Sequence, residues 1–219
     1  MQPSNKCPIS IAGRAETARW MVVIGANTGG PQALAELLPQ FPADFPGAIL
    51  VMQQMRHGFT RVLAEQLSHA CKMPVHEPVD GEIVHSSRIL MAPSRSSVTF
   101  ADAGSQSMSG CEIHIDDLGN DPAGAATRID AAMMSAAQSF GGSAIGVLLT
   151  GRGEDGCEGL RSISNAGGIT IAQDAASSVV YDMPSRAIDA GVVGEVLPLC
   201  YITDRIVRVV TEVVDANAA

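Results

Sequence analysis

The chain has 219 residues, enough for one globular domain with a sizeable core. Its formal charge of −9 and pI near 4.9 disfavour sequence-independent binding to nucleic acid or anionic membranes, because both need a basic face. No apolar run approaches the roughly 18 to 20 residues of a membrane span, which argues against membrane insertion. The 5 cysteines are scattered and include no C-x-x-C pair, which disfavours a zinc site and a disulfide framework. We therefore expect a cytoplasmic protein without a metal or cofactor.

The chain is expected to hold one domain. We predict a polar leader over residues 1–19, a single domain over 20–214 and a short tail over 215–219. Strand and helix signals alternate along this domain, which predicts an α/β fold of three layers, with a mainly parallel sheet flanked by helices.

The first half of the domain opens with a strand and a helix. Met21–Gly25 is a continuous apolar strand, and a helix is predicted to begin at Pro31. Ala48–Gln53 is a second buried strand, and Thr60 is predicted to cap a helix running to about Cys71. The side chains expected to face the core are Leu34, Leu37, Leu38 and Phe41 on the first helix, and Val62, Leu63, Leu67 and Ala70 on the second.

The pattern changes between Gly81 and Ile115. Short alternating segments at Arg88–Ala92, Ser97–Phe100 and Cys111–Ile115 are separated by serine, glycine and aspartate turns. Such segments predict a β-hairpin insertion in the α/β frame. The following stretch, Asp116–Thr127, is predicted to be a loop.

The second half returns to alternating strands and helices. Asp130 is predicted to cap a helix through Phe140, before a strand at Ala144–Leu149. A glycine loop, a helix ending near Ala166 and a strand at Ile169–Ala172 follow. The last helix is predicted from about Thr203 to Val214, with Ile206, Val209, Val210, Val213 and Val214 on one face.

Three polar loops follow predicted parallel strands, at Gly25–Gly30, Gln53–Thr60 and Thr150–Gly156. Ligands bind at this edge of open α/β sheets. The first loop has the layout of a nucleophile elbow, G-x-S-x-G, with Asn27 in place of serine. Asparagine tolerates the positive φ that we expect at such a turn, but its carboxamide cannot form an acyl-enzyme by the usual route.

These loops resemble the chemotaxis receptor protein-glutamate methylesterases, the CheB family. Where the family has GASTGG, QHMPPGFT and LTGMGxDG, this chain reads GANTGG, QQMRHGFT and LTGRGEDG. Further matches lie at Ile89–Pro93, Ala172–Tyr181 and Met183-Pro184, so the likeness runs from about residue 20 to 210.

The resemblance places the family's serine on Asn27 and its histidine on Gln54, and it retains the aspartate as Asp155. The methionine whose backbone amide lies near the family's oxyanion pocket falls on Arg152. The pocket implied by the resemblance consists of Thr28, Gly29, Met55 and Arg152. Further departures are Thr127-Arg128, where Pro-Ser is usual, and Asp182, where glycine is usual.

The family hydrolyses γ-methyl esters of glutamate on chemoreceptor helices: the serine attacks, the histidine carries the proton and the aspartate holds the histidine. Loss of the serine or histidine costs about 10⁶-fold in kcat in subtilisin, roughly 8 kcal/mol of barrier. We therefore expect an impaired or inactive domain that acts as a binding or regulatory module on chemoreceptor-like helices or another signalling protein.

Two alternatives remain open. One is an esterase or amidase of rerouted mechanism, with Thr28 or Cys157 as nucleophile and His57 as base. The other is a small-anion binder at Asn27 and Arg152. The sequence predicts no oligomeric state.

Overall fold

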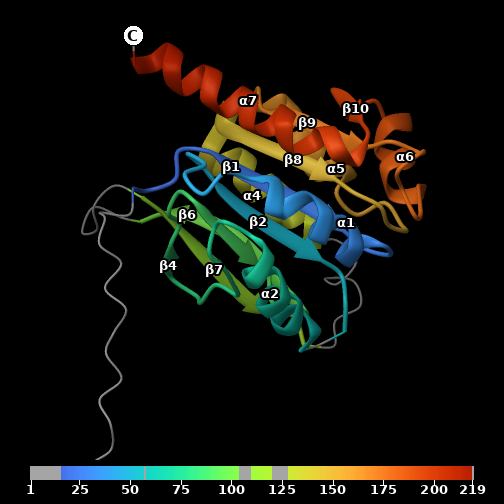
Figure 1. Cartoon of the computed structure of the whole chain (residues 1–219), viewed down its shortest axis with the longest axis horizontal. Helices are drawn as coiled ribbons and strands as arrows, with labels where there is room; N and C mark the ends of the chain where they lie inside the picture. Colours follow the sequence, from blue (N-terminus) through green and yellow to red (C-terminus); the bar gives the residue numbers. More distant parts are fainter. Residues whose placement is uncertain (1–15, 57, 104–109, 120–127, 219) are drawn as a thin grey trace, which may run out of the picture.

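The computed structural model describes residues 16–56, 58–103, 110–119 and 128–218. The fold is α/β with three layers, as predicted: a parallel sheet of 7 strands lies between two layers of helices (Figure 1). The strand order is β10-β9-β8-β1-β2-β5-β3. The strands are β1 (Met21–Ala26), β2 (Ala48–Gln53), β3 (Val75–His76), β5 (Arg88–Met91), β8 (Ala144–Leu148), β9 (Ile169–Gln173) and β10 (Glu195–Leu197).

Alternating side chains of the central strand fill a core on each side of the sheet. Val22 and Ile24 of β1 point into one core, and Met21 and Val23 point into the other. The first core is covered by α1 (Gly30–Leu37), α2 (Phe59–Ala70) and α7 (Leu199–Ala218). The second is covered by α4 (Arg128–Phe140), α5 (Cys157–Asn165) and α6 (Asp182–Asp189). Burial on both faces explains why the strands are continuous apolar runs.

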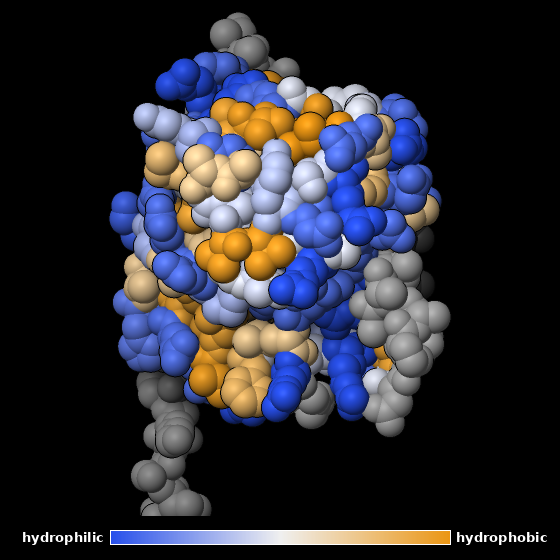
Figure 2. Space-filling view, turned by 90° about the vertical axis from the view of Figure 1, so that its right-hand side faces the viewer, coloured by the Kyte–Doolittle hydropathy of each residue, from blue (hydrophilic) through white to orange (hydrophobic). Residues whose placement is uncertain are grey.

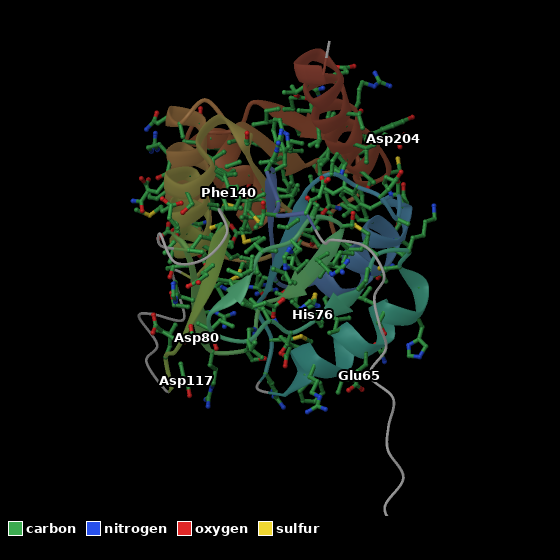
Figure 3. The ribbon with its side chains drawn as sticks, turned by 90° about the vertical axis from the view of Figure 1, so that its left-hand side faces the viewer. Glu65, His76, Asp80, Asp117, Phe140 and Asp204 are labelled. Atoms are coloured by element: carbon green, nitrogen blue, oxygen red, sulfur yellow. The ribbon has the colours of Figure 1, made fainter. Side chains whose placement is uncertain are left out.

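The predicted β-hairpin insertion is present as a separate antiparallel sheet, with the order β4-β7-β6. Its strands are β4 (Glu82–Ile83), β6 (Ser96–Asp102) and β7 (Cys111–Asp117). Figure 3 shows Asp80 and Asp117 near one end of this sheet. The sheet is tied to α4, because the Phe100 N–H donates to Ser135 Oγ at 2.7 Å.

The assignment of Arg88–Ala92 to the insertion was wrong. This segment forms β5, which pairs in parallel with β2, so that Ile89 lies opposite Ile49 in the main sheet. A short apolar run fits either kind of sheet, and only the pairing partner distinguishes them.

Several predicted helix details were also wrong. Gly58 is the N-cap of α2, whereas Thr60 lies inside the helix and its hydroxyl bonds to Glu77 and Ser94. Val62 is 50% exposed and Ala70 is exposed, so neither faces the core. The stripe on the first helix continues past α1 into a 3-10 turn, Leu38–Gln40.

The last helix is longer than predicted, since α7 runs from Leu199 to Ala218. Ile206, Val209 and Val210 are buried as predicted, but Val213 is 40% exposed. The side chain of Val214, and residues 120–127 of the predicted loop, lie outside the described residues, while Asp116 and Asp117 belong to β7. The short strands β3, β4 and β10 and the helix α6 were not predicted. Among the helices of the described ranges, none could span a membrane.

Candidate active site

The three polar loops meet at the edge of the sheet where β1, β2 and β8 end. Backbone hydrogen bonds join them: the Asn27 N–H donates to Thr150 O at 3.1 Å, and the Gln54 N–H donates to Ala26 O at 3.0 Å. The strands point toward the right of Figure 1, so Figure 2 looks onto this edge, whose surface is mainly polar with separate apolar clusters. The three loops therefore lie together at one edge of the sheet.

A series of hydrogen bonds connects Asn27, Gln54 and Asp155, the residues on which the resemblance places the family's triad. Asn27 Nδ2 donates to Gln54 Oε1 at 2.7 Å, and Gln54 Nε2 donates to Asp155 Oδ2 at 2.9 Å. An ionised carboxylate only accepts, so Gln54 must turn its NH₂ group to Asp155 and its oxygen to Asn27. Gln54 thus donates on one side and accepts on the other, as a neutral imidazole would in the same place.

Asp155 lies at the buried end of this series of hydrogen bonds, and only 5% of its surface is exposed. Its carboxylate also accepts from the N–H groups of Ile129 at 3.1 Å and Asp130 at 2.9 Å, at the start of α4. The pKa of Asp155 is raised to about 6, chiefly by burial and in part by the charge of Asp130, against the bonds from Asp130, Ile129 and Gln54, which lower it. Arg128 is also buried: burial lowers the pKa of its guanidinium, and the charge of Asp155 opposes this. The carboxylate is therefore held in place by backbone donors as well as by Gln54.

Asp130 does not cap its own helix, contrary to the prediction. It lies in the first turn of α4, and its Oδ1 accepts from the N–H groups of Gly156 at 2.9 Å and Gly159 at 2.7 Å. These donors are at the start of α5, while Asp155, just before α5, accepts from donors at the start of α4. The two helices therefore cap each other, which fixes Asp155 relative to the sheet.

The turn at Asn27 also differs from expectation. Among the described residues, only Ser87 and Arg95 are non-glycine residues with positive φ, so Asn27 does not have one. Gly29 takes φ of 84° instead and is the N-cap of α1. The glycine after the asparagine provides the conformational freedom that the turn requires.

Gln53 supports the site but was missed from the sequence. It is buried, and its Nε2 donates to the carbonyl oxygens of Asn27 at 3.0 Å and Gln54 at 2.9 Å. A Cβ on Gly30 would lie 2.0 Å from Gln53 Oε1, so the glycine makes room for this amide. The sequence signal that could have identified Gln53 is its place as a polar residue at the end of an apolar strand.

The four predicted pocket residues have different surroundings. The Arg152 carbonyl accepts from Asn27 Nδ2 at 3.2 Å, while its side chain is exposed. Thr28 is exposed, with Oγ1 3.4 Å from Asn27 Oδ1. A Cβ on Gly29 would lie 2.8 Å from Val179 Cβ, and Met55 packs partly buried against the core.

A cavity of about 990 Å³ adjoins Gln54 and Asp155. Its charged lining consists of Arg152 and Arg186 together with the acids Asp130, Glu154, Asp155, Glu158 and Asp189. Cys157 also lines it, and burial together with the charges of Asp130, Glu154 and Glu158 raises the pKa of its thiol to about 11. His57 lies outside the described residues. Within the described ranges no group of three or more His, Cys, Asp or Glu side chains is arranged to hold a metal ion.

Comparison with known proteins identifies relatives of this chain. The chain is 40% identical over 191 residues to the protein-glutamate methylesterase/protein-glutamine glutaminase 1 of Carboxydothermus hydrogenoformans, covering 87% of this chain and 55% of that protein. It is 38% identical over 189 residues to the protein-glutamate methylesterase/protein-glutamine glutaminase of Trichodesmium erythraeum, covering 86% of this chain and 52% of that protein. The chain therefore spans about half the length of these curated relatives.

A solved structure has a similar fold. The crystal structure of the Thermotoga maritima CheB methylesterase catalytic domain superposes with a TM-score of 0.80 at 32% identity, covering 87% of this chain and 98% of that one. The family model for CheB methylesterase matches residues 22–206. The resemblance seen in the loops is thus confirmed over most of the chain, which belongs to the CheB methylesterase family.

Proposed function

We propose that this chain is a CheB-type domain that has lost ester hydrolysis and acts as a binding or regulatory module. The observation that carries the proposal is the position of Gln54, hydrogen-bonded to Asn27 at 2.7 Å and to Asp155 at 2.9 Å. The two carboxamides keep the hydrogen-bond pattern of a serine–histidine pair without its chemistry. Neither group accepts a proton near neutral pH, and neither forms an acyl-enzyme by the usual route.

The proposed partner is the cytoplasmic helical part of a chemoreceptor or another signalling protein. Relatives of this chain bear the name protein-glutamate methylesterase, so a segment that carries glutamate, its methyl ester or glutamine is the ligand to test. A site that keeps its shape can hold such a side chain without cleaving it. We place this function in the cytoplasm, where the receptor segments lie.

A rerouted hydrolase is less well supported. With a pKa of about 11, only about 1 in 10⁴ of the Cys157 side chains would be thiolate at pH 7. The Thr28 hydroxyl bonds to an amide oxygen, which cannot take its proton. A small-anion site at Asn27 and Arg152 is opposed by the acids that line the adjoining cavity.

The test uses a chemoreceptor cytoplasmic fragment that carries glutamate γ-methyl esters, with methanol release as the readout. The unmodified chain should bind the fragment without releasing methanol. The double variant Asn27→Ser/Gln54→His should gain measurable hydrolysis, while each single reversion stays near background, because loss of either residue alone costs about as much as loss of the whole triad in subtilisin. Hydrolysis by the unmodified chain at an ordinary rate would refute the proposal, and so would absence of binding.

A further inference from the structure

The loop that carries Arg152 is hydrogen-bonded to the first turn of α6. Asp182 Oδ2 accepts from the Gly153 N–H at 2.8 Å, and Asp182 Oδ1 accepts from Arg186 Nε at 3.0 Å. Arg186 in turn lies 3.5 Å from Glu154 Oε2. The bonds from Gly153 and Arg186 lower the pKa of Asp182, so its carboxylate stays an acceptor at neutral pH. Two consecutive loop residues are thus tied to α6.

The peptide group between Arg152 and Gly153 is also hydrogen-bonded to Asn27 in the site. The Arg152 carbonyl, which accepts from Asn27 Nδ2 at 3.2 Å, and the Gly153 N–H belong to one peptide unit. In a trans peptide these two groups point in opposite directions. Asn27 therefore fixes one end of the unit and Asp182 fixes the other, with the oxygen toward the site and the N–H away from it.

This orientation is unfavourable for ester hydrolysis. Acyl transfer builds negative charge next to the attacking atom, and enzymes place hydrogen-bond donors there. Here a carbonyl oxygen lies beside residue 27 instead. Gly153 has φ of 97°, a glycine conformation, so the unit has the backbone freedom to rotate when it is released. A glycine at position 182 would have no side chain to make this contact.

We propose that Asp182 is a positioning residue that locks the Arg152–Gly153 peptide with its oxygen toward residue 27, and that this lock disfavours acyl transfer. The inference rests on the proposed function, because it supplies a further reason why the site binds without hydrolysing. It also implies that restoring the serine and histidine leaves the orientation of the Arg152–Gly153 peptide as an obstacle to ester hydrolysis.

The lock itself is tested by hydrogen exchange of the Gly153 amide, followed by NMR in the otherwise unmodified chain. Asp182→Gly should accelerate this exchange at least tenfold, because the amide loses its acceptor. Asp182→Asn, which keeps one acceptor oxygen and the side-chain volume, should give a smaller increase. Asp204→Asn removes one charge from an exposed acid on α7 (Figure 3) and should leave Gly153 unchanged. Unchanged exchange in a folded Asp182→Gly chain overturns the proposal.

The catalytic consequence is tested in the Asn27→Ser/Gln54→His background. Adding Asp182→Gly should raise methanol release at least tenfold over the double variant, and adding Asp204→Asn should not. Equal release with and without Asp182→Gly, including none in either, overturns the second half of the proposal. Hydrolysis by the unmodified chain would refute the proposed function but leave the exchange result standing, so the two failures are distinguishable.

Discussion

The ionisation of Asp155 should make folding stability depend on pH in a defined window. Its pKa is about 6 in the folded chain, against an ordinary value of 3.8, chiefly because the carboxylate is buried. Since the folded state holds this proton more tightly, Asp155 favours folding below about pH 3.8, and this contribution is lost as the pH rises through about 6. At about 1.4 kcal/mol per pKa unit, the loss amounts to about 3 kcal/mol.

The variant Asp155→Asn isolates this effect because it removes the titration and keeps the shape. Urea unfolding of both chains between about pH 3.5 and 7.5 gives two stability curves. Their difference, unmodified minus variant, should fall by up to about 3 kcal/mol across the window. The amide also loses an acceptor for the N–H groups of Ile129 and Asp130, but this cost is independent of pH and does not alter the slope.

Two further measurements make the result decisive. The Asp155 carboxyl carbon, followed by NMR, should titrate with a midpoint near 6. Asp204→Asn, at an exposed site, controls for the loss of one charge. A midpoint at or below about 4, or a stability difference that does not change between pH 4 and 7, would refute the reasoning that burial outweighs the three hydrogen bonds to this carboxylate.

Two substitutions, Gly30→Ala with Gly142→Ala as its control and Asp130→Ala, test the packing and the helix capping that support the site. Gly30→Ala would place a Cβ 2.0 Å from the buried Gln53 Oε1 and should lower the free energy of unfolding, measured by urea titration, by about 1–3 kcal/mol. The control Gly142→Ala, whose Cβ would meet nothing closer than 3.6 Å, should leave this free energy nearly unchanged. Equal effects of the two would contradict the proposed contact. Asp130→Ala removes the acceptor of two N–H groups at the start of α5 and should cost about 1–2 kcal/mol; a change below about 0.3 kcal/mol would mean that the mutual capping of α4 and α5 contributes little.

Much of the site was accessible from sequence because its residues lie in loops with strong local signals. A glycine turn after an apolar strand predicted where Asn27 lies, and parallel strands bring their carboxyl ends to one edge. The resemblance then selected Gln54 and Asp155, which the structure brings within hydrogen-bond distance of each other. The supporting residues were missed, because Gln53 and Asp182 act on backbone groups of other segments.

The sequence by itself determined the class of fold and the chemical nature of the site. Continuous apolar runs specified strands buried on both faces, and the carboxamides of Asn27 and Gln54 predicted a site without the usual serine–histidine chemistry. Such properties are local, so they can be read from neighbouring residues.

Only the tertiary structure decided pairing and orientation. It placed Arg88–Met91 in the main sheet, turned Asp130 toward α5 and set the Arg152–Gly153 peptide with its oxygen toward Asn27. Each outcome depends on a partner about 25 to 125 residues away in sequence. The apolar pattern of a segment is the same whichever partner it meets, so the choice is made by the packing of the whole chain.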